Sequence, residues 1–370
     1  MSIHFSIPAR INILGNPTDG NEGDYATISA AVDIRGHAVI DWQENYSLEM
    51  GKSDDPPVVF RPEDLPLPYD GEVDLLKAAQ NRLFSFSSEF KAKLSTRGFH
   101  LRVWSDVPRQ SGLGGSSLLV LLTLAALREF YGLDRRVHND YVLAELAQRV
   151  EELELGITCG YADRYVPLFG GLAYLDYRSK LYHADIGQEP FVTYERLDES
   201  VESLPLVAVT TGVHHDSGDV HGRMRPRFLA EHKKWQETGG DMPLMVSSMS
   251  AAWDCAWRGK IALLQGDLHL FGQLMNENHR LVDKMMRYCG FEDGAGQINN
   301  LFIDAAKDFG ALGAKLTGAG SGGSVFALVN PGDEEILINL WKEIASANNL
   351  QEARSYQLSI SRDGLTFRHQ

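Results

Sequence analysis

The sequence predicts an α+β fold divided into two domains. The chain has 370 residues, more than a single hydrophobic core usually supports. Segments with the pattern of strands are mixed along the chain with segments that have the apolar pattern of helices. The character of the sequence also changes near residue 200. We therefore expect one domain over residues 1–200 and a second over residues 201–370.

Strand-like segments and two helices make up the expected first domain. The strands are ARINILG (9–15), ATISAAVDI (26–34), HAVIDW (37–42), HLRVWSDVP (100–108) and GGLAYLDY (170–177). An apolar run predicts a helix from Leu118 to Tyr131, which Gly132 closes as its C-cap. The second helix is expected over about 139–155.

The expected second domain starts with a buried strand, LPLVAVTTG (204–212). A polar and basic segment follows, and helices are then expected to run through Trp253, Ile261, Leu270 and Leu281. Further along, KLTGAGSGGSVFALV (315–329) predicts a loop followed by an apolar strand.

Composition restricts the class of protein. Hydrophobic residues make up 44% and charged residues 23% of the chain, as in ordinary globular proteins. The net charge of -15 disfavours nucleic acids and anionic membranes as partners. Three scattered cysteines argue against a disulfide framework or a zinc site. Because neither a signal peptide nor an apolar run of about 18 residues is found, we expect a cytoplasmic protein.

The loop GLGGSS (112–117) has the features of a phosphate-binding site, because it directly precedes an apolar helix. A helix N-terminus leaves about four N–H groups without partners and carries partial positive charge. Glycines let the backbone close on an anion, and the hydroxyls of Ser116 and Ser117 supply caps, donors or a magnesium ligand. The alternative is an ordinary turn, since the loop matches neither the Walker A nor the dinucleotide-binding pattern.

A second glycine-rich loop lies about two hundred residues further along. It places Gly318, Gly320, Gly322 and Gly323 within six positions, next to an apolar strand. The alternative is a flexible hairpin tip. Two such loops, each beside an apolar element, favour two walls of one binding site.

Three segments resemble the sequence motifs of the GHMP kinases, in the order that this family has them. They are PARINILGNPTDG (8–20), PRQSGLGGSS (108–117) and KLTGAGSGGSVFALV (315–329). The resemblance implies a ribosomal-protein-S5-like N-terminal domain and a ferredoxin-like C-terminal domain, with ATP and an acceptor meeting between them. The implied ATP-binding residues are Pro108, Gly112, Leu113, Gly114, Gly115, Ser116, Ser117, Gly318, Gly320, Ser321 and Gly322.

The resemblance also implies catalytic residues. CGYAD (159–163) is similar to a galactokinase motif and puts Asp163 at the position of the catalytic aspartate, with Arg10 beside it. Glu151 falls at the position of the magnesium-binding glutamate, with Glu152 as the alternative register, and Ser116 would help to hold Mg²⁺. Without the resemblance, Asp163 would be interpreted as a helix cap, Arg10 as a member of a surface ion pair, and Glu151 as part of a solvated helix face.

The acceptor is expected to be a sugar. Asp19 matches the family's sugar-binding aspartate, although Asn16 and Pro17 replace the Glu and His of galactokinases. DSGDVHGRMRPRF (216–228) resembles the glucuronokinase branch. On a strand, its arginines, at every second position, would share one face and bind a carboxylate or phosphate. The predicted substrate-binding residues are Asp19, Asp163, Arg225 and Arg227; the alternative for the arginines is a solvated basic loop.

We therefore expect a sugar kinase that uses ATP and Mg²⁺, with glucuronate as the acceptor and glucuronate 1-phosphate as the product. The alternatives are a heptose or other sugar kinase of the same superfamily, or a catalytically silent protein that senses a sugar. The expected partners are the sugar and ATP, without nucleic acid or membrane. A homodimer is compatible with the sequence.

Overall fold

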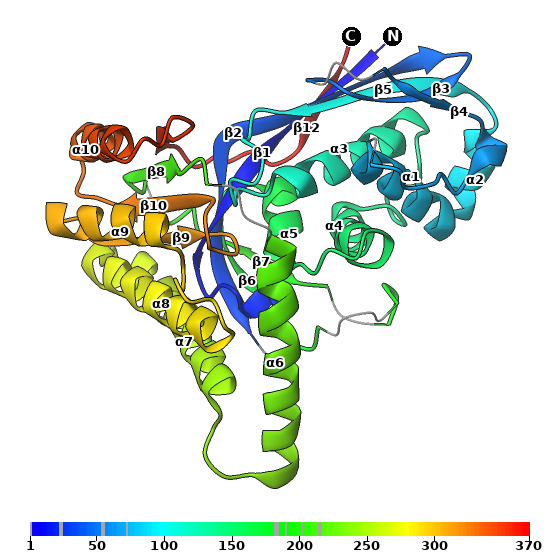
Figure 1. The fold of residues 1–370 in the computed structure, drawn as a ribbon. Helices are drawn as coiled ribbons and strands as arrows, with labels where there is room; N and C mark the ends of the chain where they lie inside the picture. Colours follow the sequence, from blue (N-terminus) through cyan, green and yellow to red (C-terminus); the bar gives the residue numbers. More distant parts are fainter. Residues whose placement is uncertain are drawn as a thin grey trace.

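The structure is a computed structural model that describes residues 2–21, 25–52, 56–71, 73–180, 185–188, 191–201, 203–213 and 217–370 (Figure 1). The described strands form two sheets. The first contains β1 (Ser2–Leu14), β2 (Ala26–Gln43), β3 (Tyr46–Met50), β4 (Val58–Phe60), β5 (Gly98–Ser105), β6 (Leu172–Asp176), β7 (Thr193–Arg196) and β12 (Thr366–His369). The second contains β8 (Leu206–Thr210), β9 (Gly313–Thr317), β10 (Ser324–Leu328) and β11 (Arg354–Leu358).

Helices lie between these strands along the whole chain. They are α1 (Asp74–Phe86), α2 (Ser88–Leu94), α3 (Gly115–Phe130), α4 (Asp140–Arg149), α5 (Ala162–Phe169), α6 (Ser217–Thr238), α7 (Leu244–Leu264), α8 (Leu268–Tyr288), α9 (Gln297–Phe309) and α10 (Glu334–Ala347). Three short helical turns add η1 (Thr18–Gly20), η2 (Pro62–Asp64) and the π-helical η3 (Val150–Glu154). The mixture confirms the predicted α+β class. No described helix is both long and apolar enough to cross a membrane.

Helix α3 is the buried helix that the sequence predicts, and it packs against β1, β2 and β5. The predicted strands 26–34 and 37–42, against which this helix packs, are one strand in the structure. β2 continues through Gly36, which lies between the two predicted segments. A Cβ on Gly36 would lie 3.2 Å from Leu122 Cδ1 and 3.4 Å from Leu118 Cβ. The glycine therefore provides room for the helix.

The apolar core continues from the first sheet into the second. Ile11 and Ala30 of the first sheet belong to the same buried cluster as Ala208 and Phe326 of the second. Helices α9 and α10 cover the second sheet, where Trp341 is fully buried. One continuous apolar core thus joins the two sheets. It also fixes where the loops that connect their strands lie relative to each other.

The last described strand returns to the first sheet. The predicted boundary at residue 200 falls between β7 and β8, which belong to different sheets. However, β12 pairs antiparallel with β1, and Figure 1 shows the red strand beside the blue one. Ser2 and Gln370 also exchange two backbone hydrogen bonds of 2.9 Å. The division into residues 1–200 and 201–370 stays a prediction.

Helix α6 corrects the expectation for the basic segment. Asp216 lies outside the described residues, but 217–238 is helical and not a strand. Val220, Met224 and Phe228 recur every four residues and are buried, so the helical period decides the structure of the segment. Positions two apart on a helix point to nearly opposite sides. The three arginines consequently do not share one face.

Candidate active site

The first glycine-rich segment lies at the N-terminus of α3. Gly112 and Gly114 have φ values of 72° and 86°, which only glycine adopts readily, and Gly114 is the N-cap of the helix. A Cβ on Gly114 would lie 3.5 Å from Cζ of Arg10. The first N–H groups of a helix have no intrahelical acceptor. The segment therefore has the shape of an anion-binding loop, and ATP binding by these glycines stays a prediction.

The second glycine-rich loop, between β9 and β10, lies directly against the first. A Cβ on Gly112 would be 2.8 Å from the Thr317 carbonyl oxygen, and a Cβ on Gly318 would be 2.8 Å from the Gly112 carbonyl oxygen. Ser324 Oγ also donates to the Ser111 carbonyl oxygen at 2.5 Å. The same turn contains the other predicted residues Gly320, Ser321 and Gly322. The two loops thus meet, as expected for two walls of one site.

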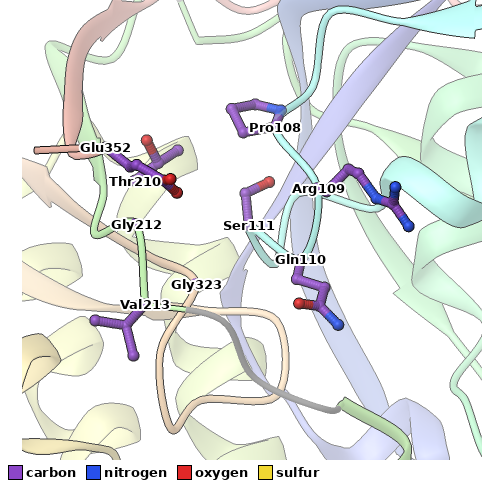
Figure 2. A pocket seen from close by; sticks show the side chains of 9 residues that line it. All are labelled: Pro108, Arg109, Gln110, Ser111, Thr210, Gly212, Val213, Gly323 and Glu352. Carbon is purple, nitrogen blue, oxygen red and sulfur yellow. The ribbon is translucent and has the colours of Figure 1, made fainter. Parts of the chain in front are cut away.

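A pocket of about 190 Å³ opens beside this contact. Figure 2 shows its lining: Pro108, Arg109, Gln110 and Ser111 face Thr210, Gly212, Val213 and Glu352, with Gly323 between them. In this view the Arg109 side chain is directed away from Glu352. Pro108, one of the predicted ATP-binding residues, therefore contributes to a pocket between the segment that precedes α3 and segments of the second sheet.

Arg10 and Asp163 form a two-pronged ion pair. The Nε and Nη2 atoms of Arg10 donate to Oδ1 and Oδ2 of Asp163 at 2.5 and 2.6 Å, and Nη1 donates to the Gly112 carbonyl oxygen at 2.6 Å. Burial raises the pKa of Asp163, but the charges of Arg10 and Arg164 and the amide of Asn12 outweigh it. The pKa therefore lies well below its usual range, and the carboxylate stays ionised.

Glu151 lies close to the start of α3. It belongs to the π-helical turn η3, and π-helical turns are frequent at functional sites. Its Oε1 accepts from Ser117 Oγ at 2.8 Å, and its Oε2 accepts from Ser116 Oγ at 3.3 Å. Glu152 instead pairs with Arg225 and Gln148. Of the two registers, the geometry favours Glu151 as the residue beside Ser116.

Asp19 belongs to the short turn η1 and is 5% exposed. Oδ2 of Asp19 accepts a hydrogen bond from the backbone N–H of Ala162 at 3.1 Å. Because Ala162 directly precedes Asp163 in the chain, this bond brings Asp19 close to Asp163. A Cβ on Gly160 would overlap the same oxygen, so this close approach requires glycine. Burial and the charge of Asp163 raise the pKa of Asp19 to about 6, against the Ala162 N–H and the charge of Arg10.

The structure separates the two predicted substrate arginines of α6. Arg225 is 8% exposed and donates to Oε1 of Glu152 at 2.5 Å. Arg227 is exposed, lies over the ring of Tyr288 at 4.0 Å, and pairs with Glu231. Only Arg225 of these two is directed towards the segment that contains Glu151.

Two family models match this chain. The N-terminal domain of the GHMP kinases matches residues 75–171, and the C-terminal domain of the GHMP kinases matches residues 260–346. "Probable glucuronokinase 2" of Arabidopsis thaliana is 30% identical over 337 residues, which cover 89% of this chain and 85% of the relative. This chain belongs to the GHMP kinase family. It is a sugar kinase, and ATP is its phosphoryl donor.

Other GHMP kinases are similar as well. The "D-glycero-alpha-D-manno-heptose 7-phosphate kinase" of Campylobacter jejuni is 29% identical over 71% of this chain and 69% of its own. The crystal structure of Lactococcus lactis galactokinase in complex with galactose aligns with a TM-score of 0.75 at 19% identity, covering 99% and 95% of the two chains. The latter likeness concerns the fold, which confirms the expected GHMP kinase architecture.

The donors beside Glu151 suit a hard cation in a GHMP kinase. Among the described residues, the hydrogen bond found for Oε2 of Glu151 is a long one, from Ser116, and Ser116 is exposed while Ser117 is buried. A carboxylate and a hydroxyl oxygen are ligands that Mg²⁺ accepts, with water and phosphate oxygens completing its shell. The residues present therefore fit the cation that the sequence predicts at Ser116 and Glu151.

Two further residues of this GHMP kinase site were not predicted from the sequence. Asn12 Nδ2 lies 3.4 Å from Oδ1 of Asp163, and Arg164 contacts both Asp163 and Glu151. A signal existed for each. Asn12 and Arg10 are two apart in an otherwise apolar strand, so they share one face. Arg164 directly follows the predicted catalytic aspartate inside a buried segment.

Asp19→Asn is expected to stabilise this GHMP kinase above pH 6 while impairing its activity. The pKa of Asp19 rises from an ordinary 3.8 to about 6 on folding, so the unfolded chain ionises first as the pH rises. Ionised Asp19 therefore lowers the free energy of unfolding by at most about 3 kcal/mol; the effect is complete well above pH 6 and is mostly lost as the pH falls to 4. Thermal unfolding at pH 4 and pH 8 checks this. An equal difference between variant and wild type at both pH values would contradict it.

Proposed function

We propose that this kinase transfers the γ-phosphoryl group of Mg·ATP to the anomeric hydroxyl of glucuronate, forming glucuronate 1-phosphate. The observation that carries the choice of a sugar acid is Arg225, a buried cation on α6. This helix passes the turn η1 (Thr18–Gly20), which contains Asp19 and which we call the acceptor loop. A Cβ on Gly20 would be 3.6 Å from Nδ1 of His221, one turn earlier on this helix. The similarity to "Probable glucuronokinase 2" supports the same class of acceptor.

A planar guanidinium binds a carboxylate through two parallel hydrogen bonds. Arg225 donates to Glu152 in this structure, so a sugar carboxylate would share or replace that partner. The pair is buried, with 9% exposure of each side chain, which makes a charge there expensive to leave unpaired. Arg225 is thus suited to distinguish an acidic sugar from a neutral one.

Asp163 would hold the acceptor hydroxyl in this mechanism. Its pKa is too low for it to remove a proton from a free sugar hydroxyl. The transition state of phosphoryl transfer is loose, so little deprotonation is needed early. The hydroxyl becomes strongly acidic only as its oxygen bonds to phosphorus, and Asp163 can then accept the proton. Its side chain is 22% exposed, which leaves it accessible to an acceptor.

The loops at the start of α3 and between β9 and β10 would bind the triphosphate. N–H groups at the start of a helix stabilise phosphate charge that builds up during transfer. Bound Mg²⁺, held by Glu151 and Ser116, would neutralise the phosphate oxygens. Arg10 touches both Asp163 and the carbonyl of Gly112, so it connects the acceptor side of the site to the phosphate side.

A second candidate is a heptose kinase, favoured by the relative from Campylobacter jejuni whose name gives a heptose 7-phosphate as its substrate. A sugar phosphate is also an anion, so Arg225 would serve it equally well. Comparing turnover of a uronate with turnover of a heptose 7-phosphate therefore distinguishes a carboxylate from a phosphate on the acceptor.

An assay of ATP consumption with glucuronate, galacturonate, glucose, galactose and heptose 7-phosphate tests the proposal. We expect turnover to be fastest with glucuronate, and Arg225→Ala to raise KM for it at least about tenfold while KM for ATP stays the same. Arg227→Ala is the matched control, because Arg227 is exposed two positions away on the same helix. Faster turnover of a neutral sugar, or an unchanged KM in Arg225→Ala, would refute the choice of a sugar acid.

A further inference from the structure

Arg164 contacts the two carboxylates to which the proposed mechanism gives different tasks. Its side chain is 1% exposed. Nη2 lies 2.8 Å from Oε1 of Glu151, and Nη1 lies 3.6 Å from Oδ2 of Asp163. Nη1 also donates to the Gly160 carbonyl oxygen at 2.7 Å. One rigid, planar group therefore spans the carboxylate on the cation side and the carboxylate on the acceptor side.

Arg164 and Arg10 are not equivalent. Arg10 comes from β1 and binds both oxygens of Asp163, and its Nη1 donates to the carbonyl oxygen of Gly112 in the first glycine-rich segment. Among the described residues, the ion pairs found for Glu151 are with Arg164 alone. Arg164 is thus the cation that connects Glu151 to Asp163.

We propose that Arg164 is a positioning residue that fixes Glu151 and Asp163 relative to each other. It holds Glu151 through Oε1, together with the buried hydroxyl of Ser117. Oε2 consequently faces the exposed Ser116 and is the oxygen presented to a divalent cation. The proposal rests on the roles suggested above for Glu151 and Asp163, and it does not depend on which sugar is the acceptor.

A purely structural role would not require an arginine here. Burying a guanidinium is costly unless its charge and its N–H groups are matched, and apolar side chains often fill such places with equal stability. The charge of Arg164 is matched by the two proposed functional carboxylates, and Nη1 also donates to the carbonyl of Gly160, which lies against Asp19. The segment 160–164 is thereby held as one unit beside the acceptor loop. The buried Nε of Arg164 has no hydrogen-bond partner among the described residues, so burial of this group is not fully compensated.

Arg164→Lys provides the test, because lysine keeps the charge but its single ammonium group cannot bridge both carboxylates. We expect kcat to fall at least about tenfold with the sugar that is turned over fastest, and KM for ATP to change less than about threefold, since small misalignment mainly slows the chemical step. Arg149→Lys is the matched control: Arg149 is also a buried arginine, paired with Glu145 at 2.9 Å. It should lose stability without a loss of kcat.

A double-mutant cycle with Glu151→Gln separates positioning from general destabilisation. If Arg164 acts through Glu151, Arg164→Lys should lower kcat far less in the Glu151→Gln background than in the wild type. The melting temperatures of the four proteins, measured without nucleotide or metal, should also be non-additive. Additive effects on both quantities, or a kcat of Arg164→Lys equal to that of Arg149→Lys, would overturn the proposal. Because the fastest sugar is used, failure of the glucuronate assignment leaves this test intact.

Discussion

Asp163→Asn is expected to lower kcat at least about a hundredfold while the fold and ATP binding are retained. Asparagine has nearly the same shape, but it cannot accept the proton of the attacking hydroxyl, and it offers Arg10 one acceptor oxygen where aspartate offers two. The positive charges of Arg10 and Arg164 would then face an uncharged side chain. Steady-state kinetics with the fastest sugar, together with a nucleotide-binding titration, measure the two effects separately.

Asp198→Asn is the control for Asp163→Asn. Asp198 accepts two hydrogen bonds from Arg196, at 2.8 and 2.6 Å, in a similar two-pronged pair. Its substitution should reduce stability to a comparable degree and leave kcat unchanged. A kcat within threefold of the wild type for properly folded Asp163→Asn would show that transfer proceeds without this carboxylate.

Gly114→Val is expected to weaken ATP binding and to slow turnover, each by at least about tenfold. Valine at a φ of 86° is strained by more than about 1 kcal/mol, and its Cβ would stand 3.5 Å from the guanidinium carbon of Arg10. The branched side chain would also fill the space in front of the first N–H groups of α3. Each charge-assisted hydrogen bond to phosphate that it prevents is worth about 1.5–3 kcal/mol. Isothermal titration with ATP and initial-rate kinetics measure both quantities.

Gly132→Val is the matched control at the other end of the same helix. Gly132 also has a positive φ, 55°, but nothing lies within 4 Å of a Cβ built there. Gly132→Val should therefore cause the same kind of backbone strain without weakening the binding of ATP. If Gly114→Val and Gly132→Val bind ATP equally well, the loop does not belong to the nucleotide site.

The elements with a simple pattern were predictable from the sequence. The apolar run 118–131 predicts helix α3 because almost any packing would bury it, and the predicted strand segments form parts of β1, β2, β5 and β6. The other strands of the first sheet, β3, β4, β7 and β12, were not predicted. Helix α6 was predicted wrongly because three arginines at every second position suggest a strand. The apolar positions Val220, Met224 and Phe228 have the helical period and determine the structure. Which charged residues pair cannot be read from a local pattern.

The candidate site shows the same limit. The motifs identified Asp163, Arg10 and Glu151 as candidates, but their partners come from distant elements. Arg10 and Asp163 are 153 positions apart, and the glycine-rich loops meet only because two sheets share one core. The role of Arg164 depends on such contacts, so its place beside Asp163 in the chain was not enough to reveal it.

The return of β12 to the first sheet has a consequence for biosynthesis. Residues 366–369 leave the ribosome after all the other described strands, yet they pair with β1, the first of them. Until then β1 has β2 on one side and an open row of backbone N–H and C=O groups on the other, which is the kind of edge that recruits other chains. Completion of the first sheet therefore has to wait until residues 366–369 are available, and a chain without them exposes this edge of β1.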